Sequence, residues 1–126
     1  MSLLGKQAPD FTLQNTAGNE ITLSETLDGG PTVVIMFRAA WCSFCAEQLQ
    51  TFSALSYDLW HNHDVDILPV SSDSIGNLVE MRDRYELTIQ LLSDPEYETT
   101  RAYTDVVTHD QRDDYTRAGT FVVDTD

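Results

Sequence analysis

The residues of this 126-residue chain best suited to chemistry are its two cysteines, Cys42 and Cys45. A three-residue step puts both sulfurs on one face of the first turn of a helix. Such a turn offers free backbone N–H groups and the positive end of the helix dipole, which stabilise a thiolate. A thiolate attacks a disulfide or a peroxide, and the neighbouring thiol then closes a disulfide and releases the product. The pattern predicts a redox-active dithiol.

The segments on either side of the pair indicate a strand followed by a helix. Residues 32–37 (TVVIMF) form a continuous, β-branched apolar run after Gly-Gly-Pro, which is typical of a strand buried on both faces. Apolar residues then recur at three- and four-residue steps from Leu49 to Leu59, which predicts a helix from about Cys42 to Trp60. Cys42 therefore lies where a buried strand passes into a helix.

The alternation of strands and helices continues along the chain. Residues 6–23 are expected to form an N-terminal β-hairpin, followed by one helical turn at Ser24 and Glu25. Further strands are expected at 65–70, 90–92 and 121–123, helices at 75–85 and from about 95 to 103, and a loop at 106–115. This order predicts an α/β fold with a central, mostly parallel sheet flanked by helices. We expect one domain over 1–126 that is C-terminally incomplete, with a final strand and helix missing and a sheet edge left uncovered.

The composition limits the partners. Twenty-one acidic residues against seven basic ones give a formal charge of −14, which repels nucleic acid and anionic membranes. The charge is interpreted as a solvated acidic surface or as adaptation to a salty cytoplasm. Stability that stays flat from low to molar potassium chloride would contradict the second interpretation. The sequence shows no apolar run long enough to span a membrane. We expect no secretory signal at its start. A single close pair of cysteines in such a chain suggests a working dithiol in a reducing cytoplasm.

Three other interpretations of the cysteine pair are open. A structural zinc site needs two more ligands, and the nearest candidates, His61 and His63, would lie roughly 24 Å along the predicted helix from Cys45. The cysteines could instead be inert core residues. A purely structural disulfide is the third alternative, but so short a loop stabilises little. We expect no metal and no cofactor.

Several motifs carry a resemblance to a known family. They are GKQAPDFTL at 5–13, FRAAWCSFCAEQL at 37–49, VSSDS at 70–74, LSDP at 92–95 and TFVVD at 120–124. The chain resembles the thioredoxin-like superfamily and, within it, the peroxiredoxin-like branch (alkyl hydroperoxide reductase/thiol-specific antioxidant) in its version with CxxC. The resemblance implies a thioredoxin-like fold, an antioxidant oxidoreductase acting on hydroperoxides or disulfides, and a thioredoxin or small-thiol reductant.

The resemblance leaves two assignments of the attacking cysteine. The family places Thr or Ser three residues before its peroxide-reactive cysteine, and Pro four residues before that. If Cys45 attacks, as its better alignment with the family's motif favours for peroxide reduction, these positions hold Cys42 and Arg38. If Cys42 attacks, as its place nearest the helix terminus favours for disulfide exchange, they hold Ala39 and Ile35.

Four further residues are candidates for supporting the dithiol. Arg38 could lower a cysteine pKa by its charge or pair with a surface acid. Trp41 is expected to cover the dithiol and pack on the end of the sheet, and Phe44 to be exposed where an apolar partner could dock. Arg117 could reach the site from the last loop, one place before Ala118, which stands where the family has arginine and thioredoxins have a cis-proline.

The leading hypothesis is a cytoplasmic, peroxiredoxin-like thiol oxidoreductase. A thioredoxin-like protein-disulfide reductase without peroxidase activity is the first alternative, and reduction of insulin disulfides would support it. A non-catalytic redox sensor or binding module is the second, and a dithiol that cycles without turning over a substrate would support that one.

Overall fold

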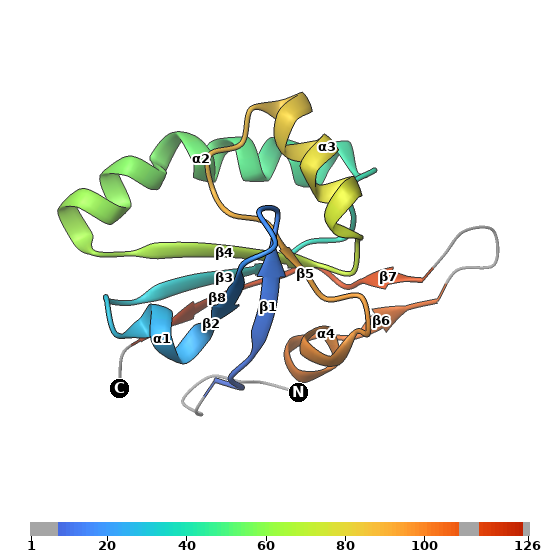
Figure 1. Ribbon diagram of the computed structural model, residues 1–126, viewed down its shortest axis with the longest axis horizontal. Helices are drawn as coiled ribbons and strands as arrows, with labels where there is room; N and C mark the ends of the chain where they lie inside the picture. The colour runs from blue at the N-terminus through green and yellow to red at the C-terminus, as the bar shows by residue number, and fades with distance from the viewer. Residues whose placement is uncertain (1–7, 109–113, 125–126) are drawn as a thin grey trace.

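The computed structural model describes residues 8–108 and 114–124. It contains a six-stranded sheet in the order β2-β1-β5-β4-β3-β8. Helices α2 and α3 lie over one face of the sheet, and α1 and α4 lie on the other (Figure 1). The strands of this sheet are β1 (Thr12–Asn15), β2 (Glu20–Thr22), β3 (Thr32–Met36), β4 (Asp66–Ser71), β5 (Leu92–Ser93) and β8 (Gly119–Val123). The helices are α1 (Leu23–Leu27), α2 (Ser43–His63), α3 (Ile75–Tyr85) and α4 (Glu98–Tyr103). The predicted α/β class and N-terminal hairpin are confirmed.

The sheet is mixed, so the expectation of a mostly parallel sheet was too strong. Parallel pairing is confined to β3, β4 and β5, which are joined by the crossover helices α2 and α3. The hairpin β1–β2 adds to β5 antiparallel, and β8 adds to β3 antiparallel. Gly119 pairs with Met36, so the start of β8 lies beside the end of β3, and β8 runs antiparallel to β3.

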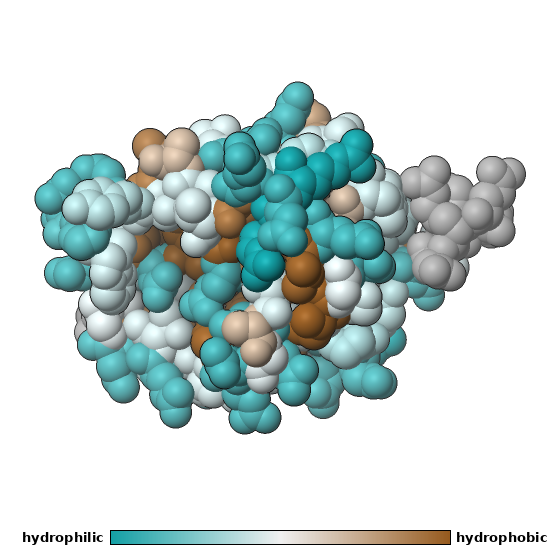
Figure 2. Space-filling model, turned by 45° about the horizontal axis from the view of Figure 1, so that its top comes forward, coloured by the Kyte–Doolittle hydropathy of each residue, from teal (hydrophilic) through white to brown (hydrophobic). Residues whose placement is uncertain are grey.

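Each face of the sheet has its own core. Under α2 and α3, Ile35 and Phe37 pack with Leu49, Leu78 and the two cysteines. Under α1 and α4, Val34 and Met36 pack with Leu23 and Tyr103. Alternate residues of β3 thus serve opposite faces, as expected of a strand buried on both sides. The outer surface on the α2 and α3 side is mostly hydrophilic, with hydrophobic residues in recesses between polar ones (Figure 2).

The long helices begin at side-chain caps. The Ser74 hydroxyl accepts the Asn77 N–H at 3.2 Å, so Ser74 caps α3. Cys42 caps α2 and is not itself helical. The helix continues three residues past the predicted end at Trp60 and stops at His63, where Asp64 takes a left-handed conformation with φ of 56°.

The segment expected to be a loop at 106–115 contains two short strands. Strands β6 (Val106–Val107) and β7 (Tyr115–Thr116) pair antiparallel as a separate ribbon. Two-residue strands are too short to show alternation, which is why sequence patterning missed them. The buried Thr116 fixes the ribbon to α4, since its hydroxyl lies 3.0 Å from that of Thr100. Residues 109–113 of the predicted loop, and 6–7 of the predicted hairpin, lie outside the described residues.

Within 8–108 and 114–124, β8 is an edge strand of the sheet, and Val122 on it is exposed. The expectation of an uncovered edge agrees with this order, while the single incomplete domain stays a prediction. Across the same residues, no helix combines the length and apolar character needed to cross a membrane.

Candidate active site

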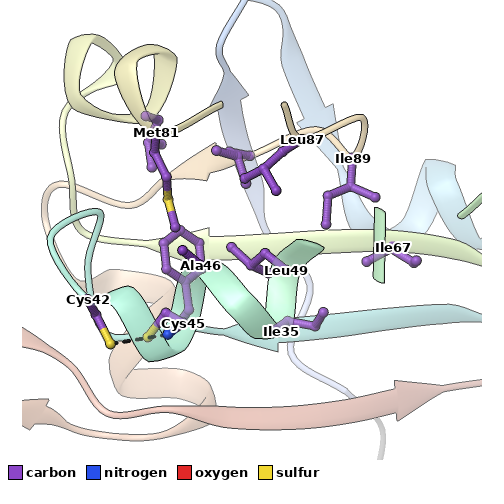
Figure 3. Close-up of a cluster of buried hydrophobic side chains, with 12 residues drawn as sticks. Ile35, Cys42, Cys45, Ala46, Leu49, Ile67, Met81, Leu87 and Ile89 are labelled. Carbon is purple, nitrogen blue, oxygen red and sulfur yellow. Dashed lines mark hydrogen bonds between the residues drawn. The ribbon is translucent and has the colours of Figure 1, made fainter. Parts of the chain in front are cut away.

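The end of β3 and the start of α2 position the cysteine pair. The Phe37 N–H bonds to the Val70 carbonyl at 2.9 Å and closes the ladder, after which the chain leaves the sheet. A tight turn follows, in which the Cys42 N–H donates to the Ala39 carbonyl at 3.1 Å. Cys42 then caps α2, and its Sγ accepts the N–H of Cys45 at 3.3 Å, the dashed line of Figure 3. The sulfur of Cys42 therefore lies at the positive end of a 21-residue helix.

The two thiols are free, adjacent and buried, with 8% of Cys42 and 5% of Cys45 exposed. Burial raises the pKa of Cys45 to about 11, and a hydrogen bond with the Cys42 side chain adds to the effect. Hydrogen bonds from the backbone of Arg38 and of Ala39 lower the pKa of Cys45 in part. Cys45 therefore holds its proton at neutral pH, while Cys42 has an N–H donor directed at its sulfur.

Asp73 fixes the turn before Cys42, a role that sequence analysis did not suggest. Its Oδ2 accepts the Ala40 N–H at 2.9 Å and the hydroxyl of buried Ser71 at 2.7 Å. The Ser93 hydroxyl donates to the Asp73 carbonyl. An acidic residue soon after a parallel strand, at the sheet edge where the cysteines lie, is the signal that could have identified it.

Tyr115 of β7 joins two of the predicted supporting residues at the rim of the site. The Arg38 guanidinium lies 5.3 Å from the centre of the Tyr115 ring, and the Trp41 ring meets the Tyr115 ring edge-on at 5.6 Å and 89°. The Arg38 side chain thus contacts an aromatic ring, and its effect on a cysteine pKa stays a prediction. Trp41 is half exposed and packs on Tyr115 of the ribbon. Tyr115 is the site residue that the sequence analysis missed.

The remaining two candidates lie on different elements. Phe44, in the first turn of α2, is 79% exposed, as expected. Arg117 lies between β7 and β8, and its Nε is 3.7 Å from Asp105 Oδ2 in an exposed ion pair. The role of Arg117 at the dithiol stays a prediction.

The other features suited to ligands lie away from the cysteines. His61 and His63 fall in the last turn of α2, at the opposite end from Cys42. Within the described part of the chain, no three His, Cys, Asp or Glu side chains gather closely enough to hold a metal ion. A groove of about 520 Å³ is lined by the far half of α2 and residues 88–90, including Tyr57 and Trp60, and by none of the predicted site residues.

A buried dithiol at the junction of a central strand and a helix, in a mixed sheet covered on both faces, defines a thioredoxin-fold dithiol protein. The chain belongs to the AhpC/TSA family, whose model matches residues 4–126. It is 31% identical over 90 residues to the chloroplast peroxiredoxin Q of Oryza sativa, an alignment that covers 71% of this chain but only 41% of the rice protein.

Two other similarities agree with this membership. The chain is 28% identical over 101 residues to the thiol-disulfide oxidoreductase ResA of Geobacillus thermodenitrificans, covering 79% of this chain and 56% of that protein. The crystal structure of peroxidoxin BcpB from Mycobacterium tuberculosis superposes with a TM-score of 0.84 at 22% identity, covering 97% of this chain and 79% of the other. The thioredoxin-like fold expected from the sequence is confirmed.

Proposed function

We propose that the protein is a thiol oxidoreductase that reduces hydroperoxides or disulfides by cycling between the Cys42–Cys45 dithiol and disulfide. The observation that carries the proposal is the bond from the Cys45 N–H to Cys42 Sγ at the start of α2. Cys42 Sγ lies at the N-terminus of α2 and accepts this N–H, whereas the pKa of Cys45 is raised by burial, so Cys45 keeps its proton. Cys42 is therefore the attacking thiolate and Cys45 the resolving thiol.

With a hydroperoxide, the Cys42 thiolate attacks the outer oxygen and the O–O bond breaks. Cys42 becomes a sulfenic acid, and the alkoxide takes a proton and leaves as an alcohol. Cys45 then loses its proton and attacks the Cys42 sulfur, expelling hydroxide, which leaves as water. One peroxide is reduced by two electrons, and the two thiols are oxidised to one disulfide.

With a disulfide, the Cys42 thiolate attacks one sulfur and expels the other as a thiolate. The Cys45 thiolate attacks Cys42 in the resulting mixed disulfide and releases the second substrate thiol. Trp41 and Phe44 flank Cys42 and are 50% and 79% exposed, which favours a protein disulfide as one substrate. Protein-disulfide reduction is for this reason the second candidate function.

A thiol reductant returns the enzyme to its starting state, and we propose thioredoxin or a small thiol for this role. The similarity to peroxiredoxins and to a thiol-disulfide oxidoreductase supports both substrate classes. A working dithiol of this kind is suited to a reducing cytoplasm. The charge of −14 argues against nucleic acid and anionic membranes as partners.

The test is rapid mixing of the reduced protein with hydrogen peroxide, followed by tryptophan fluorescence. The Trp60→Phe variant is used so that Trp41 is the only tryptophan that contributes to the signal. A saturable loss of two thiols per chain, much faster than with a free thiol, supports peroxide reduction. A slow peroxide reaction together with rapid insulin-disulfide reduction supports the second candidate. If neither substrate oxidises the pair faster than a free thiol, the proposed function is wrong.

A further inference from the structure

Tyr115 contacts two residues of the short segment that precedes the cysteine pair. Its ring meets the Arg38 guanidinium on one side and the Trp41 indole on another. Arg38 and Trp41 are the two ends of residues 38–41, the chain between β3 and Cys42. A side chain from a different sheet thus holds both ends of the loop that leads into the dithiol.

The same loop supplies groups that act on Cys45. Hydrogen bonds from the backbone of Arg38 and of Ala39 stabilise negative charge on the Cys45 sulfur. Cys45 is otherwise buried, and burial opposes that charge. The loop must therefore be held in place at the moment when Cys45 becomes a thiolate. Asp73 fixes its middle through Ala40, and Tyr115 fixes its ends.

We propose that Tyr115 is a positioning residue of the dithiol site, holding residues 38–41 in the geometry in which Cys45 resolves the oxidised Cys42. The inference rests on the proposed function. In the step concerned, the Cys45 thiol gives its proton to solvent, and the thiolate attacks the Cys42 sulfur. A Cys42–Cys45 bond forms, the bond from Cys42 to its oxygen or sulfur substituent breaks, and the leaving group departs with the electron pair.

Tyr115 contacts the loop through its aromatic ring and not through its hydroxyl. Within the described part of the chain, the Tyr115 hydroxyl makes no hydrogen bond. Tyr115→Phe keeps both ring contacts, and Tyr115→Leu removes them. Tyr57, which is exposed on the far half of α2 and stacks on His61, gives a matched control in Tyr57→Leu.

The experiment follows the reaction of reduced protein with an aromatic disulfide that releases a coloured thiol, such as 5,5′-dithiobis(2-nitrobenzoate). The first release reports attack by Cys42, and the second reports resolution by Cys45. In Tyr115→Leu we expect the second release to slow about tenfold, with the first changed less than about threefold. Tyr115→Phe and Tyr57→Leu should both give wild-type rates. The rate of the second release in Tyr115→Leu should also need a higher pH to reach its maximum.

Two results overturn the inference. One is a wild-type rate and pH profile of the second release in Tyr115→Leu, and the other is a Tyr115→Phe variant as slow as Tyr115→Leu. If Tyr115→Leu does not fold, Arg38→Gln removes one ring contact from an exposed position, and an unchanged second release there overturns the inference equally. If the wild-type protein itself gives no second release, the proposed dithiol cycle fails, which is a separate outcome.

Discussion

The backbone N–H of Cys45 donates to the sulfur of Cys42 at 3.3 Å, so the proposed resolving residue also supports the proposed attacking one. The contact follows from Cys42 being the cap of α2 and not its first helical residue. The sulfur occupies the place that a serine or aspartate oxygen takes at an ordinary helix start. The same geometry that caps the helix thus makes the two cysteines chemically unequal.

Alkylation of single-cysteine variants tests this inequality. At pH 7, we expect Cys45 in Cys42→Ser to react with iodoacetamide at least about 100-fold more slowly than Cys42 in Cys45→Ser. In the wild type the pKa of Cys45 is raised to about 11, chiefly by burial, which Cys42→Ser retains, so its thiolate forms only well above neutral pH. Its rate should therefore still be climbing at about pH 10. A plateau below about pH 8 for Cys45 would contradict the assignment.

Asp73 is expected to be needed for the turn before Cys42. Asp73→Ala leaves the Ala40 N–H and the buried Ser71 hydroxyl without their acceptor, which should cost about 1–3 kcal/mol in the free energy of unfolding. The first release of the coloured thiol, which reports attack by Cys42, should slow several-fold. Asp73→Asn keeps an oxygen acceptor and should lie closer to wild type. Urea denaturation measures the change in stability, and the assay with the coloured thiol measures the rate of the first release. If Asp73→Ala matched the wild type in both, Asp73 would not be needed for the turn.

Thr32 offers a stabilising substitution in β3. Its side chain is fully buried, and its Oγ1 has no hydrogen-bond partner in the part of the chain that the structure describes. Thr32→Val removes the unpaired hydroxyl at nearly constant shape and should raise the free energy of unfolding by about 1 kcal/mol. Thr100→Val is the matched control, because Thr100 is as fully buried but its hydroxyl bonds to that of Thr116. That variant should be destabilised, and a loss of stability in Thr32→Val would show that the hydroxyl has a partner.

Gly30 is required by the close approach of two segments. It has a φ of +142°, and a Cβ there would lie 2.1 Å from the Asp64 carbonyl oxygen at the end of α2. Gly30→Ala should destabilise the protein by about 3 kcal/mol through both backbone strain and this clash. Gly18→Ala controls for conformation alone, since Gly18 has a φ of +81° but a Cβ added to it would meet nothing within 4 Å. Thermal unfolding should rank Gly30→Ala well below Gly18→Ala, and similar melting temperatures would contradict the clash.

Local sequence patterns predicted most of the helices and central strands. The apolar run at 32–37 and the three- and four-residue periodicity after it located β3 and α2, and α3 was predicted with its bounds as observed. These patterns report which side chains of one segment share a face, and that spacing depends only on the local geometry of a helix or strand. The strand β5 began two residues later than expected, since a two-residue strand carries little pattern.

The sequence by itself determined the dithiol, its place between a buried strand and a helix, and the order of the main elements. Only the tertiary structure decided that the sheet is mixed, that Asp73 holds the turn through Ala40, and that Tyr115 joins Arg38 to Trp41. Each of these depends on how distant segments pair, which periodicity within one segment does not encode. The raised pKa of Cys45 also required the structure, because burial and hydrogen bonds set a thiol pKa and both come from the folded chain.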